Sequence, residues 1–264
     1  MFEASSRIRL AAAIEALGTT AREAFAHLRH AGVRGVQWPA AAAGLRPRDL
    51  DRGGRRDLAT VLRRFELEMS GVDLPIPAEH FGDASRVDRA VAAAEEAIRF
   101  AAEFSRVPVC MRLPALRRGD VDGGSSSSEA EGAIAAVLAV ADRHGVRLAD
   151  ETVPPPDTSS DRALVGLGLD PVALLAGGFD PAAVALERGA DVVAARWCDL
   201  DAAGVRLPPG LGGRLDVVRY RVSLEIAGFE GHVVIDPRQW NDPIGGVAIS
   251  VDAWREAASP AEPS

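Results

Sequence analysis

Acidic and arginine side chains stand at the ends of several apolar segments that have the length of a β-strand. The residues in these positions are Arg112, Glu151, Asp170, Arg196 with Asp199, and Asp236 with Arg238. Carboxylates that converge on one concave site either bind a divalent cation or are neutralised by arginine. The sequence contains the side chains for both outcomes, so the placement of the strands decides between them.

The stretch GVRLADETVPPP, Gly145 to Pro156, ends an apolar strand on two adjacent acids. Side chains alternate between the two faces of a strand, so Asp150 and Glu151 point in opposite directions. We expect Asp150 to have a structural role in the helical layer or a loop. Glu151 has three open interpretations: a metal ligand or acid/base residue, a carboxylate paired with arginine, or a solvated strand end.

Eight segments have the length and composition of buried strands, and segments of helical period separate most of them. These strands are predicted over Ile8 to Ile14, Val33 to Trp38, Leu67 to Leu74, Val107 to Leu113, Val146 to Glu151, Val165 to Asp170, Val192 to Asp199 and His232 to Asp236.

Helices are predicted where apolar residues recur at helical spacing. A first helix begins at Thr19 or Thr20, with Glu23 near the capping-box position, and ends at Gly32. Three later stripes, each a set of apolar residues that recur at helical spacing, are expected to face the core. They are Val87, Val91, Ala94, Ile98 and Ala101; then Ile134, Val137, Leu138 and Ala141; then Leu215, Val218, Val222 and Ile226.

This alternation of strands and helices predicts right-handed crossovers and a parallel sheet. Eight strands favour a closed α/β barrel, the (β/α)8 or TIM barrel, over an open doubly wound sheet, and no G-x-G-x-x-G motif follows the first strand. A length of 264 residues suits one such barrel. We therefore predict a single domain over residues 1–264, with a C-terminal tail at 258–264.

Two segments break the regular pattern and make the predicted barrel irregular. Residues 117–128, which include DVDGGSSSS, are expected to form a flexible loop after the fourth strand. The connection from Glu151 to Asp170 is short and rich in proline, aspartate, serine and threonine. The crossover helix between the fifth and sixth strands is therefore expected to be shortened or missing.

Composition excludes several classes of function. The net charge of −8 argues against a nucleic-acid partner. All 30 basic residues are arginine, so Schiff-base chemistry on lysine is excluded. Cys110 and Cys198 lie far apart and are expected to be reduced, apolar residues. The N-terminal segment fits neither a signal peptide nor a spanning helix, so we expect a cytoplasmic protein without a membrane partner.

Five motifs in order along the chain resemble those of the xylose isomerase-like barrel family, which includes sugar-phosphate isomerases and epimerases. AGVRGVQW resembles the second-strand segment of the family, with Gln37 where an acid is common. The others are GVRLADE at the fifth strand, VGLGLDP at the sixth, ARWCDLD at the seventh and GFEGHVVIDP at the eighth. The resemblance covers nearly the whole chain.

The resemblance implies a divalent metal, Mg²⁺ or Mn²⁺, and a pair of acids that moves a proton between adjacent sugar carbons. By position it implies Glu151, Asp170 and Asp236 as metal ligands and Glu151 with Asp236 as the acid/base pair. The position of a histidine ligand is occupied by Arg196, which cannot ligate a metal. Asp236 is one methylene shorter than the family's glutamate, and Ala173 replaces a substrate-binding histidine.

Further residues are candidates for substrate binding. Arg112, Arg196 and Arg238 would bind phosphate or carboxylate oxygens. His80 follows the third strand, where the family often places a substrate-facing histidine, and its alternative is a local hydrogen-bonding role. Trp240 either forms an apolar wall for a sugar or packs in the core. For Asp170, the alternative to a pocket role is capping the helix that follows it.

Two functional hypotheses remain open. The first is a sugar or sugar-phosphate isomerase or epimerase, acting on a small keto-sugar or polyol by metal-assisted proton transfer. The second is a non-catalytic barrel in which Arg196 replaces the metal and no cofactor is present; it would bind an anionic metabolite or a protein partner. A metal-dependent endonuclease would need more histidine ligands than the 5 histidines here supply, and a basic groove.

Overall fold

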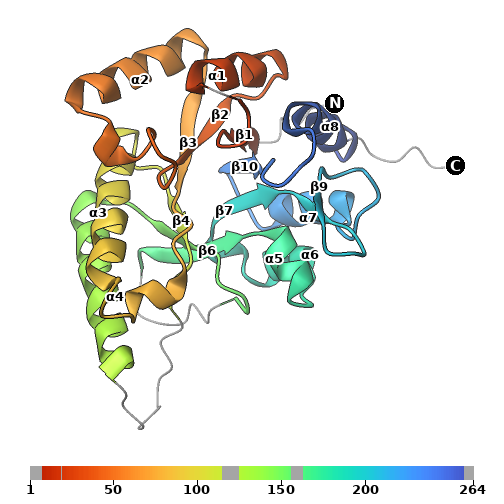
Figure 1. Ribbon diagram of the computed structural model, residues 1–264. Coiled ribbons are helices and arrows are strands. Elements are labelled where there is room, and N and C mark those ends of the chain that lie inside the picture. Colours follow the sequence, from red (N-terminus) through yellow and green to blue (C-terminus); the bar gives the residue numbers. More distant parts are fainter. Residues whose placement is uncertain (1–7, 19, 115–124, 156–162, 259–264) are drawn as a thin grey trace, which may run out of the picture.

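The computed structural model describes residues 8–18, 20–114, 125–155 and 163–258. Eight parallel strands close into a barrel in the order β1-β10-β7-β6-β5-β4-β3-β2, with helices around it (Figure 1). The (β/α)8 fold is therefore confirmed. The barrel strands are β1 (Arg9–Ala13), β2 (Gly35–Pro39), β3 (Glu68–Asp73), β4 (Val109–Met111), β5 (Leu148–Asp150), β6 (Val165–Leu169), β7 (Val192–Trp197) and β10 (His232–Ile235).

Each barrel strand falls within or close to a predicted segment. Between β7 and β10 the chain adds an antiparallel hairpin of β8 (Asp199–Leu200) and β9 (Arg206–Leu207), which the sequence did not predict. The helices are α1 (Ala21–His30), α2 (Arg52–Arg64), α3 (Val87–Glu103), α4 (Ser125–His144), α5 (Pro171–Ala176), α6 (Pro181–Glu187), α7 (Val217–Ile226) and α8 (Pro243–Glu256). Short 3₁₀ turns cover Pro47–Asp49, Ala78–Phe81 and Gly189–Asp191.

Local sequence explains where several helices begin. Thr20 caps α1 in the predicted capping box, accepting from the backbone N–H of Glu23 while the Glu23 carboxylate accepts from the N–H of Thr20. Asp170 and Asp180 cap α5 and α6, and a proline follows each cap at the first helical position. These caps set the directions in which the chain leaves β6 and enters α6.

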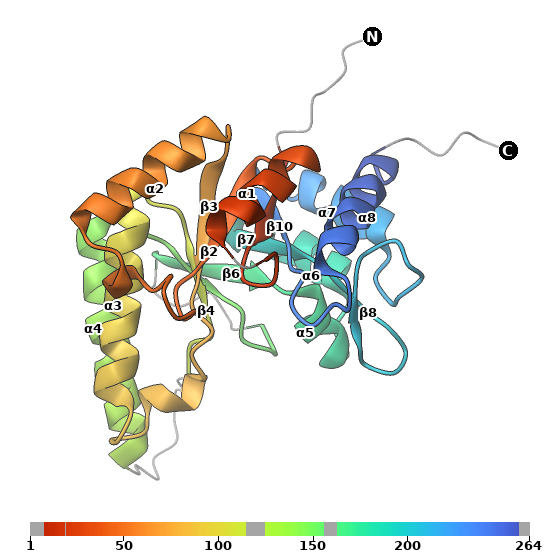
Figure 2. The ribbon, with the colours of Figure 1, turned by 45° about the horizontal axis from the view of Figure 1, so that its top comes forward.

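Helices α2 to α4 cover one side of the barrel and α5 to α8 the other (Figure 2). The predicted stripes of α3 and α4 do face the core, as shown by the buried Ala94, Ile98, Val137 and Ala141. The stripe predicted for the later helix was wrong. Val218, Val222 and Ile226 of α7 are 52%, 40% and 71% exposed, while the opposite face of α7 is buried.

Two predicted irregularities involve parts of the chain outside the described residues. The described residues between β5 and β6, 151–155 and 163–164, contain no helix; residues 156–162 lie outside the described part, so the missing crossover helix stays a prediction. Helix α4 begins at Ser125, inside the loop predicted over 117–128, and residues 117–124 of that loop are not described. Of the predicted tail at 258–264, the structure describes Ala258 alone.

Candidate functional site

Arg196 lies at the centre of a buried ion-pair cluster at the carboxyl end of the barrel. It is on β7, and its side chain points into the barrel with 1% exposure. Its Nε donates to Glu151 Oε1 at 2.7 Å, and one Nη donates to Glu151 Oε2 at 3.1 Å and to Asp73 Oδ1 at 2.6 Å. The other Nη donates to Gln37 Oε1 at 3.1 Å and to Asp236 Oδ2 at 3.3 Å.

Four strands bring these partners to the same place. Gln37 is on β2, Asp73 ends β3, Glu151 follows β5 and Asp236 follows β10. The carboxyl ends of parallel barrel strands converge on one mouth, which explains why residues far apart in sequence meet there. Gly168 on β6 makes room for this packing, because a Cβ at that position would lie 2.7 Å from Glu151 Cγ.

Asp236 is fully buried and is surrounded by guanidinium groups. Arg238 binds it with two parallel contacts, from Nε to Oδ1 at 2.8 Å and from Nη2 to Oδ2 at 2.7 Å. Arg206 donates to the same Oδ2 at 2.6 Å, and Arg196 is the third partner of this oxygen. The three arginines hold the pKa of Asp236 far below its usual value despite its burial. Asp236 is therefore fixed as a carboxylate.

Arg206 reaches the cluster from the β8–β9 hairpin. It lies 3.8 Å from Asp170, whose Oδ1 accepts from the backbone N–H groups of Val172 and Ala173 at the start of α5. Asp170 therefore caps α5, as one interpretation expected, and it also borders the cluster, while its role toward a ligand stays a prediction. Burial at the same site raises the pKa of the Cys198 thiol, which points toward Asp170 Oδ1 at 3.6 Å.

Glu151 differs from Asp236 in its electrostatics. Its burial raises the pKa of the carboxyl to about 7, although Arg196 acts in the opposite direction. The acids Asp73 and Asp170 also raise this pKa. The two carboxyls that the sequence paired as acid and base thus have pKa values shifted in opposite directions, and only Glu151 can change protonation near neutral pH.

The donor set does not fit the divalent cation that the resemblance implies. Such a cation must contact carboxylate oxygens directly. The oxygens of Glu151 and Asp236 instead accept hydrogen bonds from Arg196, whose guanidinium has no lone pair for a metal and repels a cation. Within the described residues, no group of three or more histidine, cysteine, aspartate or glutamate side chains is arranged to hold a metal ion.

Three predicted substrate-binding residues lie outside the cluster. Arg112 follows β4 with an exposed side chain. His80 is half-buried in the 3₁₀ turn after β3, where its Nε2 is 2.8 Å from Arg86 Nη1. Trp240 is buried and packs against the backbone of Gly246 in α8. The structure brings together Glu151, Asp170, Arg196, Asp236 and Arg238, and places these three elsewhere.

Two cluster residues were missed from the sequence. Asp73 is the second-last residue of the strand predicted over Leu67 to Leu74 and the last residue of the observed β3, so the strand-end rule used for the other acids would have found it. Arg206 lies in a hairpin that no periodic pattern indicates, and no sequence signal pointed to it. Asp199, which lies with Arg196 near the end of one predicted strand, accepts from the backbone N–H groups of Leu200 and Leu215. Asp150 has the structural role expected of it, accepting from the N–H groups of Leu113 and Thr152.

The described helices include none that is both long and apolar enough to cross a bilayer. Both cysteines are free and buried.

Solved structures with the same fold include a xylose isomerase domain protein from Planctomyces limnophilus, with 16% identity, a TM-score of 0.74 and 95% of each chain covered. The 3-keto-D-glucoside 4-epimerase YcjR from E. coli has 14% identity and a TM-score of 0.73, covering 94% of this chain and 99% of that chain. D-psicose 3-epimerase from Clostridium cellulolyticum H10 has 13% identity and a TM-score of 0.70, covering 95% and 99%. No curated protein matches the chain significantly.

A model of the family described as "Xylose isomerase-like TIM barrel" matches residues 25–257. The match spans most of the chain and includes every strand that contributes a residue to the cluster; β1, which contributes none, lies before it. It agrees with the closed barrel and with the order of the five sequence motifs. The chain therefore belongs to the xylose isomerase-like TIM barrel family.

Proposed function

We propose that this protein is a barrel of the sugar isomerase/epimerase type that binds a small sugar or polyol without a metal, because Arg196 replaces the metal. One observation carries the proposal: Arg196 donates to Glu151, Asp73 and Asp236 at once inside the barrel. A buried guanidinium with this many charge-assisted hydrogen bonds is not displaced by a weakly held cation. Metal-assisted proton transfer is then not its reaction.

Charge balance favours a neutral ligand over an anionic one. The cluster contains four carboxyl groups, Asp73, Glu151, Asp170 and Asp236, and three guanidinium groups, Arg196, Arg206 and Arg238. It therefore has no surplus positive charge to attract a phosphate or carboxylate. A sugar hydroxyl can both donate and accept, so it suits a site where ionised donors and acceptors alternate.

Arg206 and Arg238 are the most exposed side chains of the cluster. Their side chains are 14% and 25% exposed, whereas Arg196 is enclosed. We place the sugar hydroxyls against these two guanidinium groups. The names of the solved relatives, which include epimerases of D-psicose and of a keto-glucoside, make ketoses the first compounds to test.

The metal part of the proposal is tested by incubating the protein with MnCl₂, desalting it and measuring bound manganese. We expect none in the unmodified protein. Arg196→His removes the cation that balances the acids, so MnCl₂ should raise the Tm of that variant while leaving the unmodified protein unchanged. Stoichiometric manganese in the unmodified protein would overturn the proposal.

The ligand part is tested by calorimetry with D-tagatose and with xylitol. We expect binding to the unmodified protein and weaker binding to Arg238→Met, since that arginine faces the mouth. Arg34→Met is the matched control, because Arg34 forms an exposed ion pair with Glu66 on the outside of the barrel. Equal affinities in all three proteins would argue against a ligand at this mouth.

A second function is favoured by the raised pKa of Glu151, about 7. A carboxylate with this pKa can take the proton from the carbon beside a ketose carbonyl and return it to the same carbon, with Arg206 and Arg238 near the oxyanion that develops in between. Asp236, fixed as a carboxylate, takes no proton. Incubation of D-tagatose in D₂O distinguishes the two functions, because deuterium uptake at carbon that stops in Glu151→Gln indicates catalysis, and no uptake indicates binding alone.

A further inference from the structure

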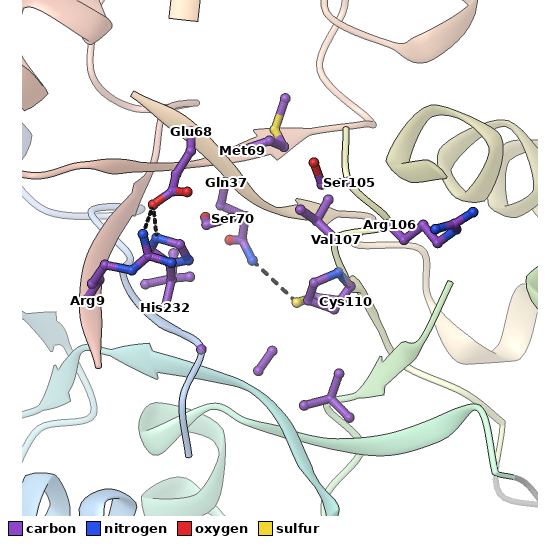
Figure 3. Close-up of a pocket in the computed structure, with 15 residues that line it drawn as sticks. Arg9, Gln37, Glu68, Met69, Ser70, Ser105, Arg106, Val107, Cys110 and His232 are labelled. Carbon is purple, nitrogen blue, oxygen red and sulfur yellow. Dashed lines mark hydrogen bonds and ion pairs between the residues drawn. The ribbon is translucent and has the colours of Figure 1, made fainter. Parts of the chain in front are cut away.

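A cavity of about 310 Å³, drawn with its lining residues in Figure 3, opens at the amino-terminal end of the barrel. The arginine cluster lies at the other end, where the strands finish. The rim of the cavity includes Arg9, Glu68 and His232, which begin β1, β3 and β10. Its inner end reaches Gln37 and Cys110. In barrel enzymes the reaction site lies at the other end, and the amino-terminal end serves stability. A cavity here therefore needs its own explanation.

Small side chains inside the barrel explain why the space exists. Barrel interiors are usually filled by layers of bulky branched residues. Here the interior contains two separate small clusters, one of Ala11, Ala13 and Val234 and the other of Cys110, Ala149 and Ala194. The two clusters do not meet, and the cavity is lined by Val234 from one and by Cys110 and Ala194 from the other.

One wall of the cavity is polar and carries no net charge. Arg9 and His232 both contact Glu68, the histidine with its Nε2 at 3.1 Å from Glu68 Oε1 (Figure 3). Burial lowers the pKa of His232, so the ring is neutral at pH 7. Arg106 also lines the cavity, but its side chain points away and its Nε donates to the carbonyl of His144. This wall thus favours a neutral ligand.

Ser70 contributes a hydroxyl that has no partner. It lines the cavity and is 8% exposed, and its Oγ makes no hydrogen bond to any described residue. A buried hydroxyl without a partner is unfavourable, and a ligand that bonds to it removes that penalty. The facing wall is apolar, formed by Val107, Pro108, Val193 and Ala194.

We propose that this cavity is a second binding site, independent of the sugar site, for a neutral molecule of one-ring size that carries a hydroxyl on an apolar body. The hydroxyl bonds to Ser70 beside the Glu68–His232 pair, and the ring packs on Val107, Val193 and Ala194. The volume is at the lower end of the range for ligand pockets, which limits the ligand to about one ring.

Phenol is the probe, with benzene as the matched compound that lacks the hydroxyl. We measure both by calorimetry and ligand-observed NMR up to about 10 mM, which covers weak small-molecule affinities. Phenol should bind at one site and more tightly than benzene. In Ser70→Ala the affinity for phenol should fall about three- to tenfold, the effect of one hydrogen bond, and the preference over benzene should disappear.

Two further variants locate the binding. Ala194→Leu fills the cavity from β7 and should abolish binding of both compounds, with circular dichroism confirming that it folds. Thr60→Ala removes an exposed hydroxyl on α2 and should bind phenol as the unmodified protein does. Equal binding of phenol to the unmodified protein, Ser70→Ala and a folded Ala194→Leu would overturn the proposal, as would the absence of binding to the unmodified protein.

Discussion

At the scale of single residues, Arg196 supplies a covalently attached positive charge to three buried acids. A metal can leave and return, whereas a guanidinium on β7 stays among Asp73, Glu151 and Asp236. Its planar group also matches the carboxylate of Glu151 with two parallel hydrogen bonds, which a lysine could not do. We therefore regard Arg196 as part of the barrel's stability as well as of its site.

If Arg196 stabilises the barrel, Arg196→Met should greatly lower the free energy of unfolding. The variant leaves the carboxyls of Asp73, Glu151 and Asp236 buried without their shared cation, and breaking such a pair from one side costs about 3–5 kcal/mol. Urea denaturation should show this loss in the free energy of unfolding. Arg34→Met, which breaks an exposed pair, should cost less than about 1 kcal/mol. A similar effect of the two substitutions would contradict the prediction.

A second residue-scale prediction concerns pH. The pKa of Glu151 rises from 4.5 to about 7 on folding, so between these values the folded state holds a proton that the unfolded state has lost. Its contribution is fully present below pH 4.5 and is lost as pH rises through about 7. Compared with Glu151→Gln, the unmodified protein should therefore lose stability from pH 5 to pH 8 in urea titrations. Parallel profiles for the two proteins would refute this assignment.

Asp236 has the opposite dependence. Its pKa is lowered on folding, so its contribution is present above about pH 4, the ordinary range of an aspartate, and is lost on further acidification. The contributions of the two acids to stability can therefore be measured separately. That of Glu151 is lost as pH rises through about 7, and that of Asp236 is lost as pH falls below about 4.

At the scale of elements, α7 shows how packing selects one of two apolar faces. Val218, Val222 and Ile226 recur at helical spacing, and so do Tyr220 and Leu224. The second face is buried because Tyr220 stacks on Trp197, and Arg221 lies over the ring of Trp254. Packing against the aromatic rings on β7 and α8 thus determines which face of α7 points into the core.

This packing predicts unequal effects of substitutions on one helix. Leu224→Ala creates a cavity at a fully buried position and should cost about 2–5 kcal/mol. Ile226→Ser, at a position that is 71% exposed, should change the free energy of unfolding by less than about 0.5 kcal/mol. Thermal unfolding of the two variants measures the difference, and a larger loss for Ile226→Ser would mean that this face is covered.

At the scale of the whole molecule, the barrel joins strands from both ends of the chain. β1 pairs with β10 and with β2, so the sheet closes only when the first and last strands are both in place. The single domain over residues 1–264 stays a prediction, and cooperative closure of the barrel is the behaviour expected of one domain.

Closure predicts one unfolding transition for the whole chain. Trp38 packs on Phe100 of α3, whereas Trp197 and Trp254 pack against each other on the other side of the barrel. Tryptophan fluorescence and far-UV circular dichroism should therefore give the same midpoint in urea. Separate midpoints would indicate that the two sides unfold independently.

The sequence by itself determined the eight barrel strands and the fold class. Alternating apolar strands and helical stripes gave all eight barrel strands, because burial inside a parallel barrel requires continuous apolar runs. Strand-end position selected Glu151, Asp170, Arg196 and Asp236, because the carboxyl ends of the strands share one mouth. The capping box at Thr20 was also predicted, since it depends only on neighbouring residues.

Only the tertiary structure decided what those side chains do. Arg196 contacts Asp73, which is distant in sequence, and Arg206 enters from a hairpin with no periodic signal. The pKa values of Glu151 and Asp236 move in opposite directions although both are buried, because three arginines surround Asp236, whereas Glu151 pairs with Arg196 and lies near the acids Asp73 and Asp170. Contacts between distant residues and the burial of charge follow from how the barrel closes, which a linear pattern does not specify.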